Sequence, residues 1–157
     1  MRIAETEYEI LPVQTMVPRC FACGPENPSG LRLRFYAEGP TRVCALFTPP
    51  EDWTGWGTML HGGFHGLLLD ETMSWVVFGL MGEKAFVTRS MAIKYRRPVY
   101  IGRPLKITGW LEEDRGRDIC TGGDIRDQAG EVLTAASGII TRVDPEIMEK
   151  LLGGTGV

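Results

Sequence analysis

The chain has 157 residues, of which 43% are hydrophobic and 24% are charged. A chain of this length can bury most of its unfolded surface in one core, so we expect a single domain. The 20 acidic and 17 basic residues give a net charge of -3. Because no block of like charges occurs, nucleic acid and membrane surfaces are unfavoured as partners.

The first segment, MRIAETEYEILPVQ, lacks the basic start and apolar core of a secretory signal, so we expect a cytoplasmic protein. Cysteines of a cytoplasmic protein normally stay reduced. The four cysteines (Cys20, Cys23, Cys44 and Cys120) therefore favour free thiols or a metal site over a disulfide framework.

The expected domain covers residues 1–157 and has three parts. Residues 1–29 form an N-terminal segment with a Cys-x-x-Cys turn, residues 30–143 form the core, and residues 144–157 form a short helix and a tail. In the core, residues 31–38 and 41–48 alternate apolar and polar side chains, which predicts a hairpin of two half-buried strands.

The segment from about Phe64 to Met81 contains no proline and predicts a long helix. Its apolar residues occupy nearly the full circle at 100° per residue, which is typical of a helix buried on most sides. A transmembrane span is the weaker alternative, because Asp70 and Glu71 stand near the centre.

Four strand-like runs follow, at 86–98, 104–114, 117–127 and 131–144, and their short connections predict an antiparallel meander. A final short helix has Asp144 as its cap and Pro145 at its first position. The order of elements predicts an α+β fold. The long helix can be hidden only if the sheet curls around it or a second subunit covers it.

The two acids of the long helix need separate explanations, because adjacent helical side chains point about 100° apart. A carboxylate in an apolar helix is either a general base or nucleophile, or it is satisfied by an ion pair or hydrogen bond. Gly62 and Gly63 stand just before this helix. Their amides, at the positive end of the helix dipole, are able to polarise a carbonyl.

The run HGGFHGLLLDETM resembles the helix signature of hotdog-fold acyl-CoA thioesterases of the phenylacetate-pathway type. CFACGPENPSGL, WTGWGTMLHGG and VTRSMAIKYRRPV extend the resemblance from about residue 20 to residue 140. It implies a curled antiparallel sheet wrapped around one long helix. It also implies a homodimer or homotetramer with the acyl-CoA site between subunits, and no cofactor.

The resemblance also assigns roles to residues. Asp70, nine residues after His61, would be the general base or nucleophile, and Thr88, eighteen residues further on, would hold the attacking water. The Gly62 amide would polarise the thioester carbonyl, and His61 would orient the loop or substrate. This chain has Gly55 where relatives have an asparagine, which makes Glu71 a credible substitute participant.

Other residues have both a functional and a structural interpretation. Gly63, Trp56, Arg96 and Arg97 are candidate substrate contacts: the tryptophan for an acyl pocket and the arginines for CoA phosphates. A core-capping tryptophan and exposed strand-end arginines are the structural alternatives.

The remaining candidates concern metals. Cys20-x-x-Cys23 is half of a zinc knuckle, a redox pair or a tight turn, but Cys44 and Cys120 do not form a second pair. His65 follows His61 at helical metal spacing, although a packed or surface histidine is the commoner outcome. We therefore expect no metal.

The sequence predicts a thioester hydrolase that releases a free acid and CoA. Two alternatives remain: a non-catalytic domain that binds acyl-CoA or an aromatic metabolite, and a hotdog dehydratase.

Overall fold

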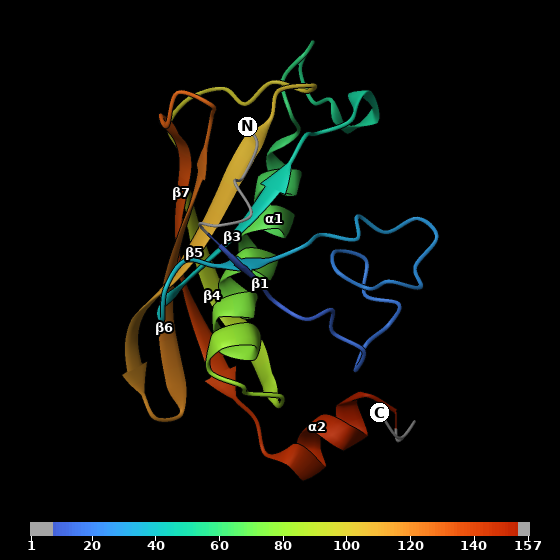
Figure 1. Cartoon of the computed structure of the whole chain (residues 1–157), viewed down its shortest axis with the longest axis vertical. Coiled ribbons are helices and arrows are strands. Elements are labelled where there is room, and N and C mark those ends of the chain that lie inside the picture. Colours follow the sequence, from blue (N-terminus) through green and yellow to red (C-terminus); the bar gives the residue numbers. More distant parts are fainter. Residues whose placement is uncertain (1–7, 154–157) are drawn as a thin grey trace.

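The computed structural model describes residues 8–153. Seven antiparallel strands form one sheet in the order β1-β2-β3-β5-β6-β7-β4, and the sheet lies alongside helix α1 (Figure 1). The strands are β1 (Glu9–Ile10), β2 (Tyr36–Ala37), β3 (Arg42–Phe47), β4 (Phe86–Tyr95), β5 (Leu105–Arg115), β6 (Asp118–Arg126) and β7 (Val132–Arg142). The helices are η1 (Glu51–Trp53), α1 (Gly62–Trp75), the π-helical η2 (Val76–Leu80) and α2 (Pro145–Leu151).

The long helix confirms the sequence prediction closely. It begins two residues earlier than expected, because His61 is its N-cap and accepts a hydrogen bond from the Gly63 amide. It continues through η2 to Leu80. No residue between 64 and 80 is exposed, as an all-round apolar helix requires. None of the helices within residues 8–153 has the length and apolarity that crossing a membrane requires.

Glycines of the sheet allow α1 to approach it closely. A Cβ at Gly109 would lie 2.8 Å from the carbonyl oxygen of Thr72, and one at Gly123 would lie 3.0 Å from Met73 Cγ. Gly138 is similarly placed against the end of the Met73 side chain. These three glycines come from β5, β6 and β7, and together they form a surface without side chains against which the middle of α1 packs.

The first predicted strand is mostly wrong. Only Tyr36 and Ala37 of residues 31–38 are extended in the sheet, paired with β3. The amides of Leu31 and Leu33 instead donate to the carbonyls of Phe21 and Ala22. The segment therefore lies against the cysteine turn, and the positive φ of Arg32, 52°, breaks the extended backbone.

The predicted meander is confirmed for β5, β6 and β7, but β4 does not pair with β5. It pairs with β7 and ends the sheet at the opposite edge. Its other edge has no strand beside it within residues 8–153, although Val87 and Tyr95 are large, exposed apolar side chains there. A long edge of this kind is a site for pairing with another chain.

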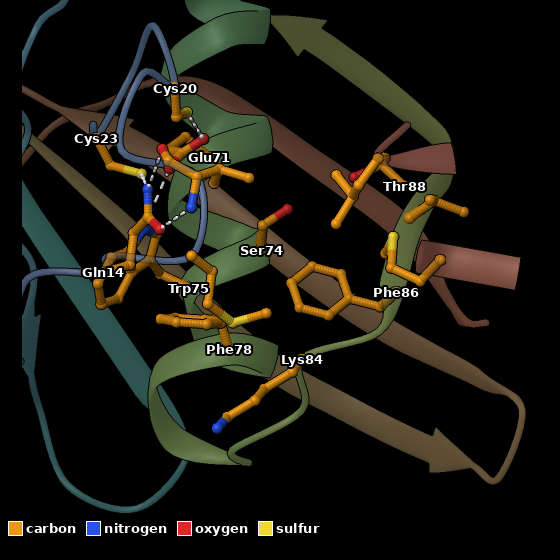
Figure 2. Close-up of a pocket in the computed structure, with 15 residues that line it drawn as sticks. Gln14, Cys20, Cys23, Glu71, Ser74, Trp75, Phe78, Lys84, Phe86 and Thr88 are labelled. Carbon is orange, nitrogen blue, oxygen red and sulfur yellow. Dashed lines mark hydrogen bonds between the residues drawn. The ribbon is translucent and has the colours of Figure 1, made fainter. Parts of the chain in front are cut away.

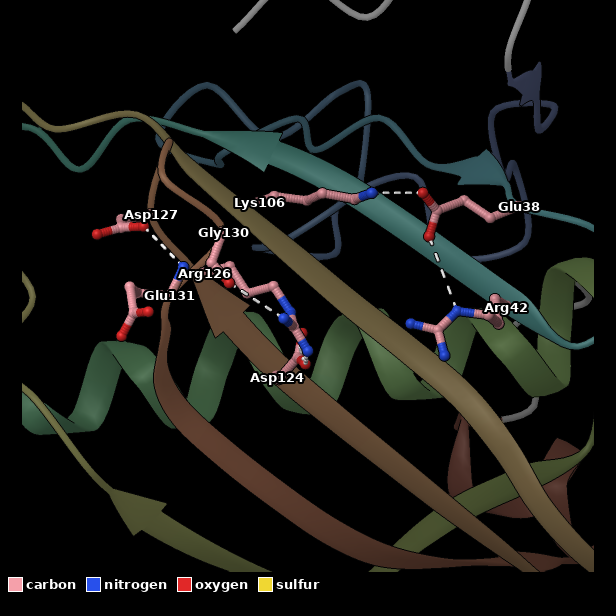
Figure 3. A network of polar contacts seen from close by, with 8 residues as sticks. All are labelled: Glu38, Arg42, Lys106, Asp124, Arg126, Asp127, Gly130 and Glu131. Carbon is pink, nitrogen blue, oxygen red and sulfur yellow. Dashed lines mark hydrogen bonds and ion pairs between the residues drawn. The ribbon is translucent and has the colours of Figure 1, made fainter.

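The outer face of the sheet, away from α1, carries a network of charged side chains (Figure 3). Lys106 lies 2.5 Å from Glu38, which also contacts Arg42. Asp124, almost fully buried, pairs with Arg126 at 2.6 Å. The outer face thus carries charged groups that are paired and partly buried, and the main apolar pocket lies on the helix side.

Candidate active site

The start of α1 presents one unpaired amide. His61 Nδ1 accepts from the Gly63 amide at 3.0 Å, so the Gly63 amide is not available to a substrate while this cap is formed. Within residues 8–153, no acceptor for the Gly62 amide is present. The Tyr95 hydroxyl donates to the Gly62 carbonyl at 3.0 Å and anchors this end of the helix to β4. The Gly62 N–H is therefore the donor left at the positive end of the helix dipole.

Asp70 lies on the helix face that borders β4. Residues at intervals of four share one face of a helix, so Gly66, Asp70 and Ser74 lie in one row. A Cβ at Gly66 would lie 3.4 Å from Ile93 of β4, and Ser74 lines a pocket together with Thr88 of β4. Asp70, half-buried, therefore lies between these two residues in the row that faces β4.

The loop before the helix contains Gly55, at the position where relatives are expected to have an asparagine. A Cβ at Gly55 would lie 3.0 Å from the Cα of His61. Position 55 therefore touches the first motif residue, as a positioning amide would need to, but the backbone of this chain leaves no room for a larger side chain without movement.

The principal pocket has a volume of about 290 Å³ and lies between α1, the N-terminal segment, β4 and α2. Figure 2 shows Gln14, Cys20, Cys23 and Glu71 gathered on one wall, with Phe86 and Thr88 opposite and Ser74 between. Much of the remaining lining is apolar and includes Met16, Trp75 and Phe78. The shape and lining suit an acyl or aromatic group.

Glu71 belongs to this pocket, whereas Asp70 does not line it. The Trp75 indole donates to Glu71 Oε1 at 3.1 Å, and the Cys20 thiol lies 4.0 Å from Oε2. Burial raises the pKa of Glu71 to about 7. The two acids thus have separate environments, as their 100° separation predicts.

The Cys-x-x-Cys turn brings its thiols to the same wall. Cys20, Cys23 and Glu71 place ligand atoms within 4.8 Å of one another. The hydrogen bond between the two thiols lowers the pKa of Cys20 to about 5 and raises the pKa of Cys23. The Gln14 amide donates to Cys23 Sγ at 3.4 Å. Sequence reasoning looked for a second cysteine pair and therefore missed the carboxylate, 51 residues away from Cys20.

Thr88 lies on the exposed edge strand, across the pocket from Glu71. The pairing of β4 with β7 shifts register between Thr88 and Ser90. A bulge of this kind redirects side chains and is common beside functional sites. Ser74 is a further hydroxyl in the pocket that the sequence reasoning did not single out, although it follows Asp70 by one helical turn.

The two tryptophans of the loop differ. Trp53 is buried and stacks on Phe64 with ring centroids 3.9 Å apart, so it caps the core. Trp56 is 83% exposed and does not line the principal pocket of its own chain. It can contact a substrate only in a site that a second subunit helps to form. His65 is buried and hydrogen-bonded to Thr134 at 2.8 Å, which is the packed alternative to a metal ligand.

Arg96 and Arg97 follow β4 and are exposed near the start of α1. Both of their amides donate to the carbonyl of Leu133, which fixes the backbone. Arg97 also forms an exposed ion pair with Glu131 at 3.3 Å. No acidic partner of the Arg96 side chain occurs in the described part of the chain, so its guanidinium is available to an anion.

A family comparison covers the centre of this site. Residues 57–134 match the sequence model of the thioesterase superfamily, and this range contains the start of α1, both helix acids and Thr88. A crystal structure of a thioesterase superfamily protein is 30% identical, covers 79% of this chain and has a TM-score of 0.72. The chain belongs to the thioesterase superfamily.

The fold of this thioesterase superfamily chain is the hotdog fold. The chain covers 60% of the length of the 30% identical protein. The Escherichia coli PaaI protein from the phenylacetic acid degradation operon is 17% identical, with a TM-score of 0.61, over 66% of this chain and 73% of its own. No curated protein matches the sequence significantly.

A thioesterase superfamily neighbour has been solved with a ligand. A hypothetical thioesterase from Streptococcus pneumoniae, in complex with coenzyme A, is 20% identical. Its TM-score is 0.65, over 71% of this chain and 85% of its own. At this level of identity the likeness shows the fold alone.

Proposed function

We propose that this protein hydrolyses an acyl-CoA or aryl-acyl-CoA thioester to the free acid and CoA, at a site shared by two copies of the chain. Membership of the thioesterase superfamily supports the reaction class. One observation carries the residue assignment: Asp70 stands on the helix row that borders the unpaired edge of β4.

The length of the helix supports a shared site. Gly62 and Asp70 are eight residues apart, which separates them by about 12 Å along the axis. One carbonyl group cannot contact both the Gly62 amide and the Asp70 carboxylate of the same chain. If both groups act on one thioester, the second must come from another subunit.

The free edge of β4 supplies a way to bring that subunit close. Two copies that pair β4 against β4 about a two-fold axis extend the sheet and bury Val87 and Tyr95. The α1 helices of such a pair run in opposite directions. The Gly62 amide of one copy then approaches the middle of the other helix, where Asp70 lies.

The chemistry follows from these two groups. The Asp70 carboxylate removes a proton from a water molecule, which attacks the thioester carbonyl carbon. The developing oxyanion accepts a hydrogen bond from the Gly62 amide at the positive end of the helix dipole. The tetrahedral intermediate then collapses, the carbon–sulfur bond breaks, and CoA leaves as a thiolate that takes up a proton.

Other residues bind and position the substrate in this proposal. The Thr88 hydroxyl holds the water, and His61 fixes the helix start through its bond to Gly63. The guanidinium of Arg96, assisted by Arg97, binds CoA phosphates near the helix start. The acyl group occupies the apolar pocket that Trp75, Phe78 and Phe86 line.

The test is a hydrolysis screen of short-chain, long-chain and aromatic acyl-CoAs, with released CoA measured by chromatography. We expect turnover by the wild type and a loss of roughly 10²–10⁴-fold in Asp70→Asn, the contribution typical of a general base. Asp52→Asn is the control, because it removes an exposed carboxylate from η1, outside the site.

Three results would count against this proposal. Unchanged turnover in Asp70→Asn would reject the base. A loss that follows Glu71→Gln instead would move the base to the pocket wall. Saturable CoA-ester binding without turnover of any ester would favour the binding-domain alternative, which the glycine at position 55 keeps open.

A further inference from the structure

The wall of the pocket formed by Cys20, Cys23 and Glu71, here called the thiol–carboxylate cluster, has no role in the proposed hydrolysis. Two of its members come from the N-terminal segment and one comes from α1 (Figure 2). The segment with the two cysteines lies outside the range that matches the superfamily. The superfamily match therefore covers Glu71 but not the two cysteines, and it assigns no role to the cluster.

The donor atoms and their spacing suit a thiophilic divalent cation. All three ligand atoms lie within 4.8 Å of one another. A tetrahedral zinc ion with Zn–S bonds of about 2.3 Å holds neighbouring sulfurs about 3.8 Å apart. Side-chain shifts of about 1 Å therefore suffice to close the site.

The backbone around the two cysteines forms a tight turn. The turn closes with a hydrogen bond from the Gly24 amide to the Cys20 carbonyl at 2.9 Å. A Cβ at Gly24 would lie 2.5 Å from the Cys20 amide nitrogen and from the Pro18 carbonyl oxygen. Only glycine fits this tight turn, which keeps both thiols on the side that faces Glu71.

Two further side chains orient the ligand atoms. The Gln14 amide donates to Cys23 Sγ at 3.4 Å, and the Trp75 indole donates to Glu71 Oε1 at 3.1 Å. Outer hydrogen bonds of this kind fix ligand orientation in metal sites. Gln14 is itself only 5% exposed, so its side chain is fixed by the surrounding protein.

A cation would also balance the charge of its ligands. Two thiolates and a carboxylate that act as ligands carry three negative charges, and a divalent cation between them compensates most of that charge. Within residues 8–153, no lysine, arginine or histidine is bonded to any of the three. Lys84 lines the same pocket but stands away from the cluster (Figure 2).

We propose that Cys20, Cys23 and Glu71 form a binding site for a thiophilic divalent cation of the zinc type. Three protein ligands leave one coordination position, which faces the pocket. The ion ties the N-terminal segment to α1 and forms part of the pocket wall. This proposal departs from the sequence-based expectation of a protein without a metal, which found no second cysteine pair to complete the site.

The experiment measures binding of Zn²⁺ and Co²⁺ to the full chain, after chelation and under reducing conditions, by competition with a chromophoric chelator. We expect tight stoichiometric binding and a thiolate-to-cobalt absorption band. Cys20→Ser and Cys23→Ser should abolish the band, and Glu71→Gln should weaken binding with the fold retained. Gln14→Leu should weaken binding by roughly 10-fold or more.

Cys120→Ser is the matched control, since it removes a free thiol of β6 outside the cluster. It should bind as the wild type does. The proposal is overturned if the wild type binds no more tightly than Cys20→Ser, or if Cys120→Ser weakens binding equally. Asp70→Asn should lose hydrolysis but keep zinc, so a failure of one proposal is distinguishable from a failure of the other.

Discussion

A substitution at Gly62 can test the proposed oxyanion donor without disturbing the rest of the site. This glycine is the first residue of α1, after the cap His61, and proline is well tolerated at this position because its missing N–H has no helical partner. The ψ of His61, 133°, is compatible with a following proline. A change to proline therefore deletes the oxyanion donor and leaves the helix intact.

We predict that Gly62→Pro lowers kcat by roughly 10²–10³-fold, the effect of losing one oxyanion-hole donor. The thermal unfolding midpoint should remain close to that of the wild type. Gly62→Ala, which keeps the amide and whose Cβ makes only ordinary contacts with Tyr95, should retain most of the activity. Equal losses in both variants would show that space, and not the N–H, matters at this position.

Single residues also show how much of the candidate site was predictable from the sequence. The helix motif predicted that His61 stands at the start of the helix that contains Asp70, and the structure has His61 as the N-cap of α1; the catalytic roles of these residues stay predictions. The environment of Glu71 was not predictable, since the Cys20 thiol that faces it comes from a segment 51 residues away. Local patterns report the face of a helix on which a residue lies, but not which distant loop covers that face.

At the scale of elements, the close approach of α1 to the sheet depends on small residues. A Cβ at Gly109 would meet backbone atoms of Thr72 and Met73 at 2.8–3.1 Å, and backbone cannot move aside without shifting the helix. A Cβ at Gly138 would chiefly meet the terminal methyl of Met73, which is the flexible end of a side chain.

We predict that Gly109→Ala lowers the free energy of unfolding by about 1–3 kcal/mol, the usual cost of overpacking. Gly138→Ala should cost clearly less, because Met73 can adopt another rotamer. Urea denaturation of both variants measures the difference. A loss as large for Gly138→Ala as for Gly109→Ala would contradict the view that backbone contact sets this cost.

Elements also show why part of the fold was mispredicted. The alternating pattern of residues 31–38 was identified correctly as half-buried, since Leu33 and Phe35 are core residues. The backbone of Leu31 and Leu33, however, is bonded to the cysteine turn, and the Phe35 carbonyl accepts from the Leu11 amide. Period-two alternation predicts which side chains are buried, but it does not specify what lies beside the backbone.

At the scale of the whole molecule, the proposed site needs a second copy of the chain. A single chain leaves one edge of β4 without a partner strand within residues 8–153 and keeps its Gly62 amide about 12 Å from its own Asp70 along the helix. Pairing across β4 resolves both features at once. The order of strands, and with it this free edge, was not predictable from the sequence, because short connections between runs do not reveal that β4 crosses to β7.

The most direct test mixes two inactive variants, Asp70→Asn and Gly62→Pro, after dissociation and re-association, with sedimentation confirming that dimers have formed. In a shared site, each mixed pair has one site with both functional groups and one with neither. The mixture should therefore recover roughly a quarter of the wild-type rate, since half of the pairs are mixed. If the mixture of re-formed dimers stays as inactive as its components, the two groups do not act across the subunit interface.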